Sequence, residues 1–293
     1  MRLGGFVIHG DNASTLPRCL DALAAVCDRL LAVDCGSTDG SRQLAEQRGF
    51  EVLSRPWEGY GAARSVAVAA LQDCDWVLFL DSDEWLEPAA LDAIRALKAA
   101  PPAEPLVALT RRDWADLGEA PFLYRTEHHV RLVRRDHARW SRGMIVHEAL
   151  PTAPVHRLDA ALEHHFATDL DGMRRKVERY ALLWALRFHE EGRRAKWPPV
   201  QRVAHLVREL LLKRAAFTGR PEAFALAVSI AGYHAAKYRV LREVARGQHD
   251  GLLTLLRQDR LVELFAALPP LPPAVPGRRA VRALSVPTAA RQA

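Results

Sequence analysis

Residues 75–86 read DWVLFLDSDEWL, a short apolar run enclosed by acidic residues. The apolar part, VLFL at 77–80, is typical of a strand buried on both faces. Three carboxylates follow it at Asp81, Asp83 and Glu84. Open α/β sheets bind ligands beyond the carboxyl ends of their strands, and Mg²⁺ commonly sits between one or two carboxylates and substrate phosphates. The stretch therefore predicts a metal and phosphate site, with an acidic turn that caps the next helix as the alternative.

The sequence around this strand alternates between short apolar runs and helical patterns. Such alternation predicts an α/β fold, a mostly parallel sheet with helices on both faces. Residues 101–126 are expected to form a loop that shapes a pocket, and residues 128–135 a further strand. The other expected strands are 3–8, 30–34, 51–54, 76–80 and 106–109, and the expected helices are 15–27, 40–48, 62–73 and 88–99.

Two loops carry candidate nucleotide-binding residues. In residues 34–40, DCGSTDG, Asp34 ends a predicted strand, where an acid can accept hydrogen bonds from a ribose or a base. Asp39 can cap the helix that follows. In residues 58–65, EGYGAARS, the glycines allow the backbone to approach a ligand, and Arg64 can meet a phosphate or a base. A loop with a helix cap explains either stretch equally well.

Three later residues are candidates for catalysis and metal binding. Glu148 follows a short apolar run within WSRGMIVHEAL at 140–150, and a carboxylate there suits a general base. His164 and His165 are adjacent, and a neutral imidazole can complete a metal shell. Taken alone, a single glutamate is more often solvated, and paired histidines are more often structural or surface residues.

Charge is unevenly distributed along the 293 residues. Residues 172–246 contain 17 Lys and Arg against 6 Asp and Glu, a net charge of +11 in a chain of +6. This asymmetry predicts an anionic partner, such as a membrane surface, a nucleic acid or a phosphorylated substrate. Helices are expected at 173–190, 200–218 and 222–247, and their Arg and Trp beside wide apolar faces suit a membrane interface. A packed helical subdomain with a solvated basic face is the alternative.

The remaining signals concern compartment and chain ends. No signal peptide is recognised, and the four cysteines show no zinc-like spacing, which together predict a reducing, cytoplasmic location. The longest uncharged stretch in the C-terminal part, residues 223–236, is shorter than the roughly 20 residues that a bilayer span needs. After residue 268 the chain is too rich in proline to pack and is expected to be disordered.

Three segments resemble the signature segments of family 2 glycosyltransferases, in order and in spacing: residues 31–40, 55–69 and 76–86. The pattern is similar to bacterial lipopolysaccharide core-biosynthesis enzymes of the heptose β-1,4-glucosyltransferase type. Further shared features are RLVR at 131–134, VHE at 146–148, a histidine (His164 or His165) before Lys176 and Tyr180, and residues 219–241, which look like membrane-associated helices.

The resemblance implies a GT-A-type nucleotide-sugar-binding domain over residues 1–168. A basic amphipathic helical region would follow at 169–250, and residues 251–293 would hold a terminal helix and the Pro/Arg-rich tail. The implied partners are a nucleotide-sugar donor, a glycan or glycolipid acceptor and an anionic membrane surface. The implied location is peripheral, on the inner face of the cytoplasmic membrane.

The implied reaction is an inverting transfer of a hexose from a nucleotide-sugar such as a UDP-sugar, with Mg²⁺ or Mn²⁺ as cofactor. Asp83 would bind the metal together with His164 or His165, and Glu148 would deprotonate the acceptor hydroxyl. Two positions depart from the family pattern, namely Asp11-Asn12 near the end of the first strand and Ser65 after Arg64. The residues expected at the nucleotide are Asp34, Asp39, Arg64 and Asp81.

Other classes remain as alternatives. The acceptor could be another cell-envelope glycan or a lipid phosphate. A phosphatase of the haloacid dehalogenase type would want Thr or Val at the position of Trp85 and a later Asp-Asp pair at a strand end, and the sequence has neither. A nucleic-acid-binding protein would explain the basic segment, but no helix-turn-helix, zinc or RNA-recognition signature is present, so no nucleic-acid partner is expected.

Overall fold

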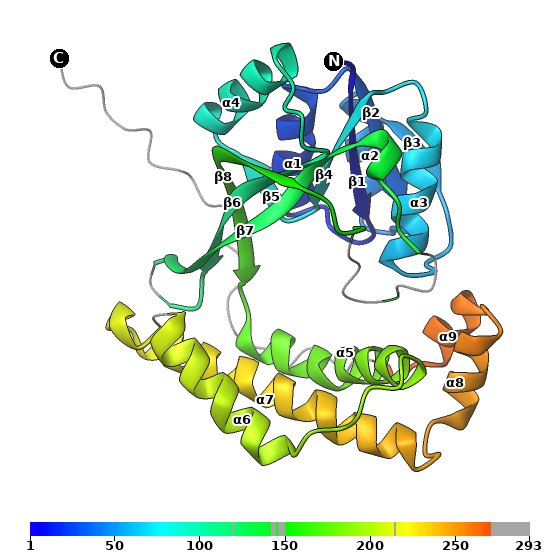
Figure 1. Ribbon diagram of the computed structural model, residues 1–293, viewed down its shortest axis with the longest axis vertical. Coiled ribbons are helices and arrows are strands. Elements are labelled where there is room, and N and C mark those ends of the chain that lie inside the picture. Colours follow the sequence, from blue (N-terminus) through cyan, green and yellow to red (C-terminus); the bar gives the residue numbers. More distant parts are fainter. Residues whose placement is uncertain (119, 142–144, 146–149, 214, 271–293) are drawn as a thin grey trace.

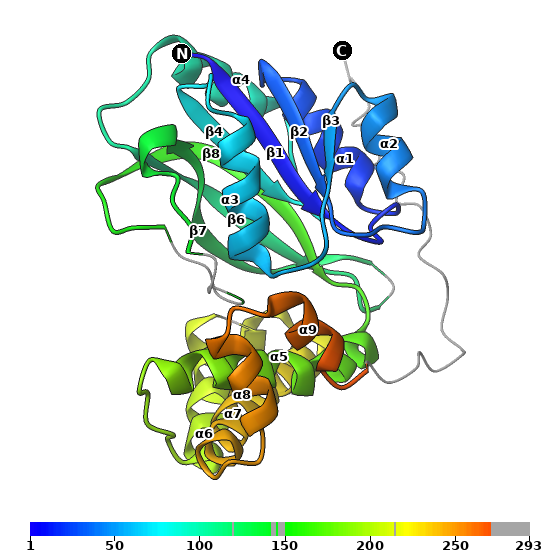
Figure 2. The ribbon, with the colours of Figure 1, turned by 90° about the vertical axis from the view of Figure 1, so that its right-hand side faces the viewer.

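The computed structural model describes residues 1–118, 120–141, 145, 150–213 and 215–270 (Figure 1). An eight-stranded sheet with flanking helices occupies the first part of the chain, and a layer of helices lies beyond one end of it (Figures 1 and 2). The strand order is β3-β2-β1-β4-β7-β6-β8-β5. This arrangement confirms the predicted α/β class with a C-terminal helical extension.

The N-terminal half of the sheet is parallel, as predicted from the alternating pattern. Residues Val77 and Phe79 of the fourth strand pack toward α3, whereas Leu78 and Leu80 pack toward α1 and α4. All four are nearly inaccessible to solvent, because a strand with helices on both faces buries every side chain. The elements are β1 (Leu3–His9), α1 (Leu16–Ala24), β2 (Arg29–Asp34), α2 (Ser41–Gln47), β3 (Glu51–Ser54), α3 (Tyr60–Ala70), β4 (Trp76–Asp81) and α4 (Pro88–Ala99).

The other half of the sheet corrects one expectation. The predicted loop at 101–126 is wrong, because most of it lies in β6 (Leu106–Ala115) and at the start of β7 (Phe122–Arg134). The acidic turn after β4 leads directly into β5 (Glu84–Leu86), which pairs with β8 (Val155–Ala167). β7 is antiparallel to β4 and β6, so the sheet is mixed. These strands are hard to recognise locally because they carry charged residues whose partners include residues of neighbouring strands, as in the pairs Arg112–Glu163 and Arg125–Asp113.

The helical layer consists of five α-helices and two short turns within residues 170–213 and 215–270. The single helix expected at 200–218 is interrupted by a π-helical turn at Arg208–Leu212 and a 3₁₀ turn at Ala215–Thr218. The tail at 271–293, expected to be disordered, lies outside the described residues. The α-helices are α5 (Leu170–Glu190), α6 (Pro198–Val207), α7 (Pro221–Ala245), α8 (Asp250–Arg257) and α9 (Leu261–Ala267).

α7 forms much of the interior of this layer. It lies beside α5 and α6, and its residues Leu226, Ala227, Val240 and Leu241 are buried. Much of the segment 219–241 therefore packs against protein, whereas Phe224 within it is 54% exposed. Among the helices that the structure describes, none is both long and apolar enough to cross a bilayer.

Candidate active site

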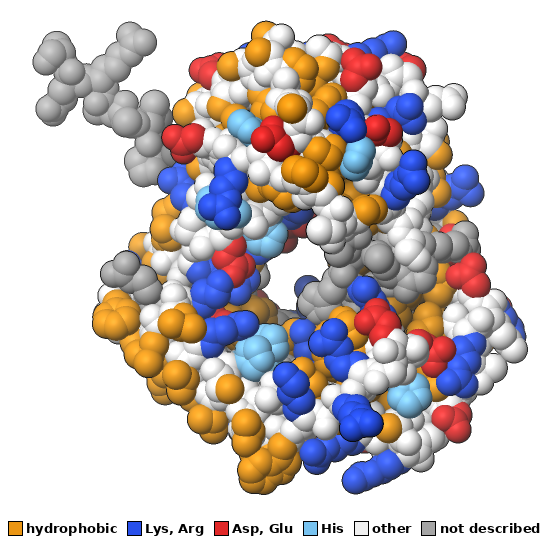
Figure 3. Space-filling model, in the orientation of Figure 1, with side chains coloured by type: hydrophobic (Ala, Val, Ile, Leu, Met, Phe, Trp, Pro, Cys, Tyr) orange, Lys and Arg blue, Asp and Glu red, His pale blue; other side chains and the backbone are white. Residues whose placement is uncertain are grey.

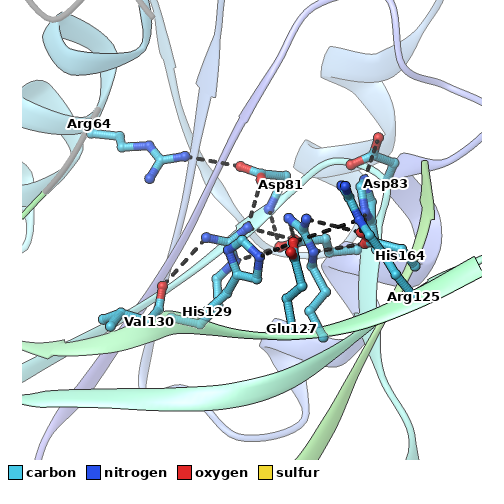
Figure 4. A network of polar contacts seen from close by, with 12 residues as sticks. Arg64, Asp81, Asp83, Arg125, Glu127, His129, Val130 and His164 are labelled. Atoms are coloured by element: carbon cyan, nitrogen blue, oxygen red, sulfur yellow. Dashed lines mark hydrogen bonds and ion pairs between the residues drawn. The ribbon is translucent and has the colours of Figure 1, made fainter. Parts of the chain in front are cut away.

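Asp81 ends β4 at the carboxyl edge of the parallel strands, where two arginines hold its carboxylate. Arg64 Nη2 from α3 lies 3.0 Å from Oδ1, and Arg131 Nη2 from β7 lies 2.8 Å from Oδ2 (Figure 4). Burial by itself would raise the pKa of Asp81, but attraction to Arg131 and Arg64 outweighs it and lowers the pKa to about 2. Asp81 is thus a fixed anion at neutral pH.

Arg131 also ties Asp81 to Glu84. The Glu84 side chain has no exposed surface, and its carboxylate accepts two hydrogen bonds from Arg131, at 2.7 Å from Nε and 2.5 Å from Nη2. Glu84 accepts a third from the Asp81 backbone N–H, at 3.1 Å. These bonds close the turn between the two acids. The side chain of Asp83, within that turn, is 39% exposed and remains accessible to a ligand.

Asp83 faces a histidine that is itself oriented by a buried carboxylate. His164 Nε2 lies 3.5 Å from Asp83 Oδ2 (Figure 4). On its other side, His164 Nδ1 lies 2.7 Å from Asp113 Oδ1. Asp113 is fully buried and pairs with Arg111 and Arg125, with closest N–O distances of 2.8 and 2.5 Å. Metal-binding histidines typically donate their second ring N–H to a carboxylate in this way.

The strand pleat distinguishes the two adjacent histidines. Consecutive side chains of β8 point to opposite faces of the sheet, so only one of them can face Asp83. His164 does so, whereas the ring of His165 packs edge-on against Trp85, with 4.9 Å between centroids. The structure therefore does not bring His165 to the candidate metal site.

The Asp83–His164 pair fits a divalent cation that shares its shell with a substrate. Within the described ranges, no group of three or more His, Cys, Asp or Glu side chains is arranged to hold a metal. One carboxylate and one imidazole would leave coordination positions for diphosphate oxygens and water. Burial lowers the pKa of His164, but hydrogen bonds to Asp113 and Asp83 outweigh it and raise the pKa to about 9. Metal binding at this imidazole must therefore release a proton.

Asp34 and Asp39 lie in the loop after β2. Asp34 is 4% exposed, and its Oδ1 accepts hydrogen bonds from the backbone N–H and the hydroxyl of Ser37, at 3.0 and 2.5 Å. Asp39 accepts from the backbone N–H groups of Ser41, at the start of α2, and of Ala13, in the loop after β1. Both carboxylates thus fix the shape of loops at the same edge of the sheet as Asp81.

The residues that depart from the family pattern bond to nearby backbone. Asp11 accepts from the Thr38 N–H at 2.6 Å, and the Asn12 side chain accepts from the Gly10 N–H at 3.0 Å. Ser65 donates to backbone carbonyl oxygens, at 2.8 Å to Gly61 and 2.9 Å to Trp140. Each of these departures is therefore accommodated by local hydrogen bonds.

Several residues of the polar network were not predicted from the sequence. One residue that was predicted to be catalytic lies outside the described residues. Arg111 and Asp113 lie in the stretch expected to be a loop, Glu84 had no separate role, and Arg131 was noted only as part of RLVR. Residues 110–115 read TRRDWA, which lacks the period-two alternation of apolar and polar residues, so no local signal marked this part of the strand. Glu148, the predicted general base, lies outside the described residues.

Comparison with known proteins identifies the family to which the residues around this site belong. Residues 7–145 match the family model described as glycosyl transferase family 2. The lipopolysaccharide core biosynthesis glycosyltransferase LpsC of Rhizobium meliloti is 28% identical over 261 residues, which cover 81% of this chain and 94% of that protein. A TPR repeat-containing protein of Synechococcus elongatus is 33% identical over 137 residues, covering 45% of this chain.

Among solved structures, the chain is similar to glucosyl-3-phosphoglycerate synthase from Mycobacterium tuberculosis, in complex with Mg²⁺ and UDP. The identity is 22% and the TM-score 0.32, over 38% of this chain and 44% of that one. The chain spans only about a third of the Synechococcus protein (33%) and of a Rickettsia felis glycosyltransferase (34%).

Residues 7–145 form a glycosyltransferase family 2 domain, which has the GT-A-type fold expected from the sequence. Within that family the chain resembles lipopolysaccharide core enzymes, with LpsC related along most of its length. The membership favours sugar transfer over the phosphatase and nucleic-acid-binding alternatives.

Replacing Arg131 by Gln is expected to lower the free energy of unfolding by about 3–5 kcal/mol, since it removes the closest cation from buried Glu84 and leaves only the more distant Arg111, at 3.5 Å. As a control, Arg95→Gln breaks an exposed pair with Asp92 and should change stability by less than about 1 kcal/mol. Urea unfolding of both variants gives the comparison. Similar losses in the two would contradict a structural role for the Arg131–Glu84 pair.

Proposed function

We propose that this protein is an inverting, divalent-metal-dependent glycosyltransferase. It would transfer a hexose such as glucose from a UDP-sugar to a glycan or glycolipid acceptor of the lipopolysaccharide core. The observation that carries the proposal is the arrangement of Asp83 opposite His164, whose other ring nitrogen is held by buried Asp113. The relationship to LpsC supports the choice of acceptor class, with another envelope glycan or a lipid phosphate as the alternative.

The donor would lie along the carboxyl edge of the parallel strands. Asp34 would contact the base from the loop that Asp39 holds, and Asp81, fixed by Arg64, would contact the ribose. Asp83 and His164 would hold Mg²⁺ or Mn²⁺ at the diphosphate. When bound, the cation neutralises the charge that develops on the leaving diphosphate. Because the arginines hold Asp81 in place beforehand, little reorganisation accompanies the reaction.

Glu148 would act as the general base, an assignment that comes from the VHE segment of the sequence. It would remove the proton of the acceptor hydroxyl while that oxygen attacks the anomeric carbon and the bond to the diphosphate breaks. Attack opposite the leaving group inverts the configuration at that carbon. No protein nucleophile is required by this displacement.

We further propose that the protein binds peripherally to the inner face of the cytoplasmic membrane. The contact would be made by an apolar stripe of exposed side chains that runs from the start of α6 to the start of α7. Val200, Val203, Val207 and Leu211 recur every three or four residues, so they lie on one helical face. Large apolar side chains in such a cluster commonly mark an interaction surface. The stripe comprises Trp197, Val200, Val203, Val207, Leu211, Leu212, Phe217 and Phe224, each at least 47% exposed.

Basic residues beside the stripe suit an anionic bilayer. Lys196, Arg202 and Arg220 occur within the same segment, and Figure 3 shows orange apolar side chains along the lower left edge with blue basic ones next to them. Apolar insertion combined with attraction to anionic lipids is the usual mode of interfacial helices. Such docking would place the sheet domain near a glycolipid acceptor.

A thermal-shift panel of nucleotides with and without Mn²⁺ tests the donor assignment. UDP with Mn²⁺ is expected to raise Tm by about 5 °C at saturating concentration, since a ligand that binds only the folded state stabilises it. Asp83→Asn should abolish the metal-dependent part of this shift. Asp92→Asn, an exposed acid on α4, should leave it unchanged. A larger increase in Tm with NAD than with UDP, or no increase with any nucleotide, would contradict the donor assignment.

The stereochemical course is expected to be inversion. Proton NMR of the product formed from an α-linked UDP-hexose should show a β-anomer, and Glu148→Gln should lower kcat by at least about 100-fold. A product of retained configuration would contradict the role assigned to Glu148.

The membrane surface is tested by flotation of the full chain with vesicles. Binding is expected to phosphatidylcholine vesicles containing about a third phosphatidylglycerol, and to weaken with salt. Val203→Asp combined with Leu211→Asp should at least halve the floated fraction. Val262→Asp, also at an exposed apolar position but outside the stripe, should not. Failure of the unmodified chain to float would refute this part of the proposal.

A further inference from the structure

The face of α5 that carries Lys176 and Tyr180 borders a cavity at the junction between the sheet domain and the helical layer. The two residues are four apart and therefore neighbours on one helical face. The cavity has a volume of about 250 Å³. Across it lie Trp57 from the loop before α3, Tyr60 from the first position of α3, and Phe265 from α9. Aromatic rings from both parts of the protein thus surround one lysine-bearing helix.

A glycine permits the close approach of chain segments at this junction. Gly59 precedes α3 with φ +94°, and a Cβ atom at this position would lie 3.2 Å from Ile145 Cα and 3.5 Å from the Phe265 ring. Both the backbone conformation and the close approach therefore require glycine. The segment just before α3 thus contacts α9 directly, with 5.6 Å between the ring centroids of Trp57 and Phe265.

The cavity continues around α5. Lys176 and Tyr180 also line an adjoining cavity of about 200 Å³, whose other walls include Ile230 and Tyr233 of α7. Tyr233 in turn borders a third space of about 510 Å³ near Arg202 and Arg239. The three spaces share lining residues on α5 and α7, and they are together called the trough. Figure 3 shows the molecule opened between its two parts, with basic side chains at the edge of the opening.

Lys176 is the available cation of the junction cavity. Within the described part of the chain it has no hydrogen-bond or ion-pair partner. The other basic residue of the cavity, Arg179, is occupied, since its guanidinium donates to the backbone oxygens of Phe265 and Pro269, both at 3.2 Å. An exposed cation beside aromatic rings matches a ligand with an apolar face and an anionic group.

The trough lies next to the donor side of the candidate active site. Tyr60 is four residues before Arg64 on α3, about 6 Å along the helix axis, and Arg64 bonds to Asp81. On the other wall, α5 begins at Leu170, six residues after His164. A molecule in the trough would therefore reach the donor from the side of the helical layer.

We propose that this trough binds the acceptor and that the acceptor is a phosphorylated saccharide. Lys176 would pair with a phosphate group, while Tyr180 and Tyr60 would contact the sugar rings. The assignment rests on the proposed glycosyltransferase function and adds the substrate class and the residues that recognise it.

Binding of glucose 6-phosphate and of glucose to the full chain with UDP and Mg²⁺ tests this proposal. Saturation-transfer NMR titrations give both affinities. Glucose 6-phosphate should bind at least about fivefold more tightly than glucose, because only it can pair with Lys176. Lys176→Gln should remove that preference and Lys176→Arg should keep it. Arg194→Gln, which removes an exposed charge outside the trough, is the matched control and should keep it too.

The thermal shift with UDP separates this inference from the proposed function. The shift should be the same in all these variants, since Lys176 is not part of the donor site. A normal shift combined with equal binding of the two sugars, or with unchanged glucose 6-phosphate binding in Lys176→Gln, would overturn the acceptor assignment. Loss of the shift in the unmodified chain would instead overturn the donor assignment, and the sugar titrations are read independently of it.

Discussion

The buried guanidinium of Arg131 is the constraint on which the candidate site depends. It joins Asp81 to Glu84, and its charge lies 5.3 Å from the centroid of the Phe79 ring. Charges in such a position are stable only when they are paired and hydrogen-bonded. The pairing closes the turn after β4, leaves Asp83 accessible and lets the chain enter β5 directly at Glu84.

The strand register of β5, β6 and β8 then determines which side chains lie opposite one another in the remaining part of the site. Glu84 pairs with His164 across the β5–β8 ladder, and Asp113 pairs with His164 across the β6–β8 ladder. A shift of one residue in β8 would exchange the faces of His164 and His165. The polar network around Asp113 stabilises the correct register, because only one imidazole can meet both carboxylates.

The helical layer gives the protein two different surfaces. The apolar stripe along α6 faces outward, whereas the Lys176 face of α5 borders the trough beside the sheet domain. α7 forms part of the interior of the layer, where its residues Leu226 and Leu241 are buried. A membrane-docked enzyme with this organisation would receive a glycolipid head group between its membrane surface and its donor site.

The sequence alone determined the parallel half of the sheet, the helices that flank it and the positions of Asp34, Asp81 and Asp83, because these follow from local apolar periodicity and from strand ends. The sequence also indicated the family, because three signature segments occur in it in the expected order. Only the tertiary structure decided that His164 rather than His165 meets Asp83, and that Arg131 and Glu84 close the turn between the acids. Those contacts join residues about 50–80 positions apart, and no local pattern encodes a strand register set by charges that pair across a sheet.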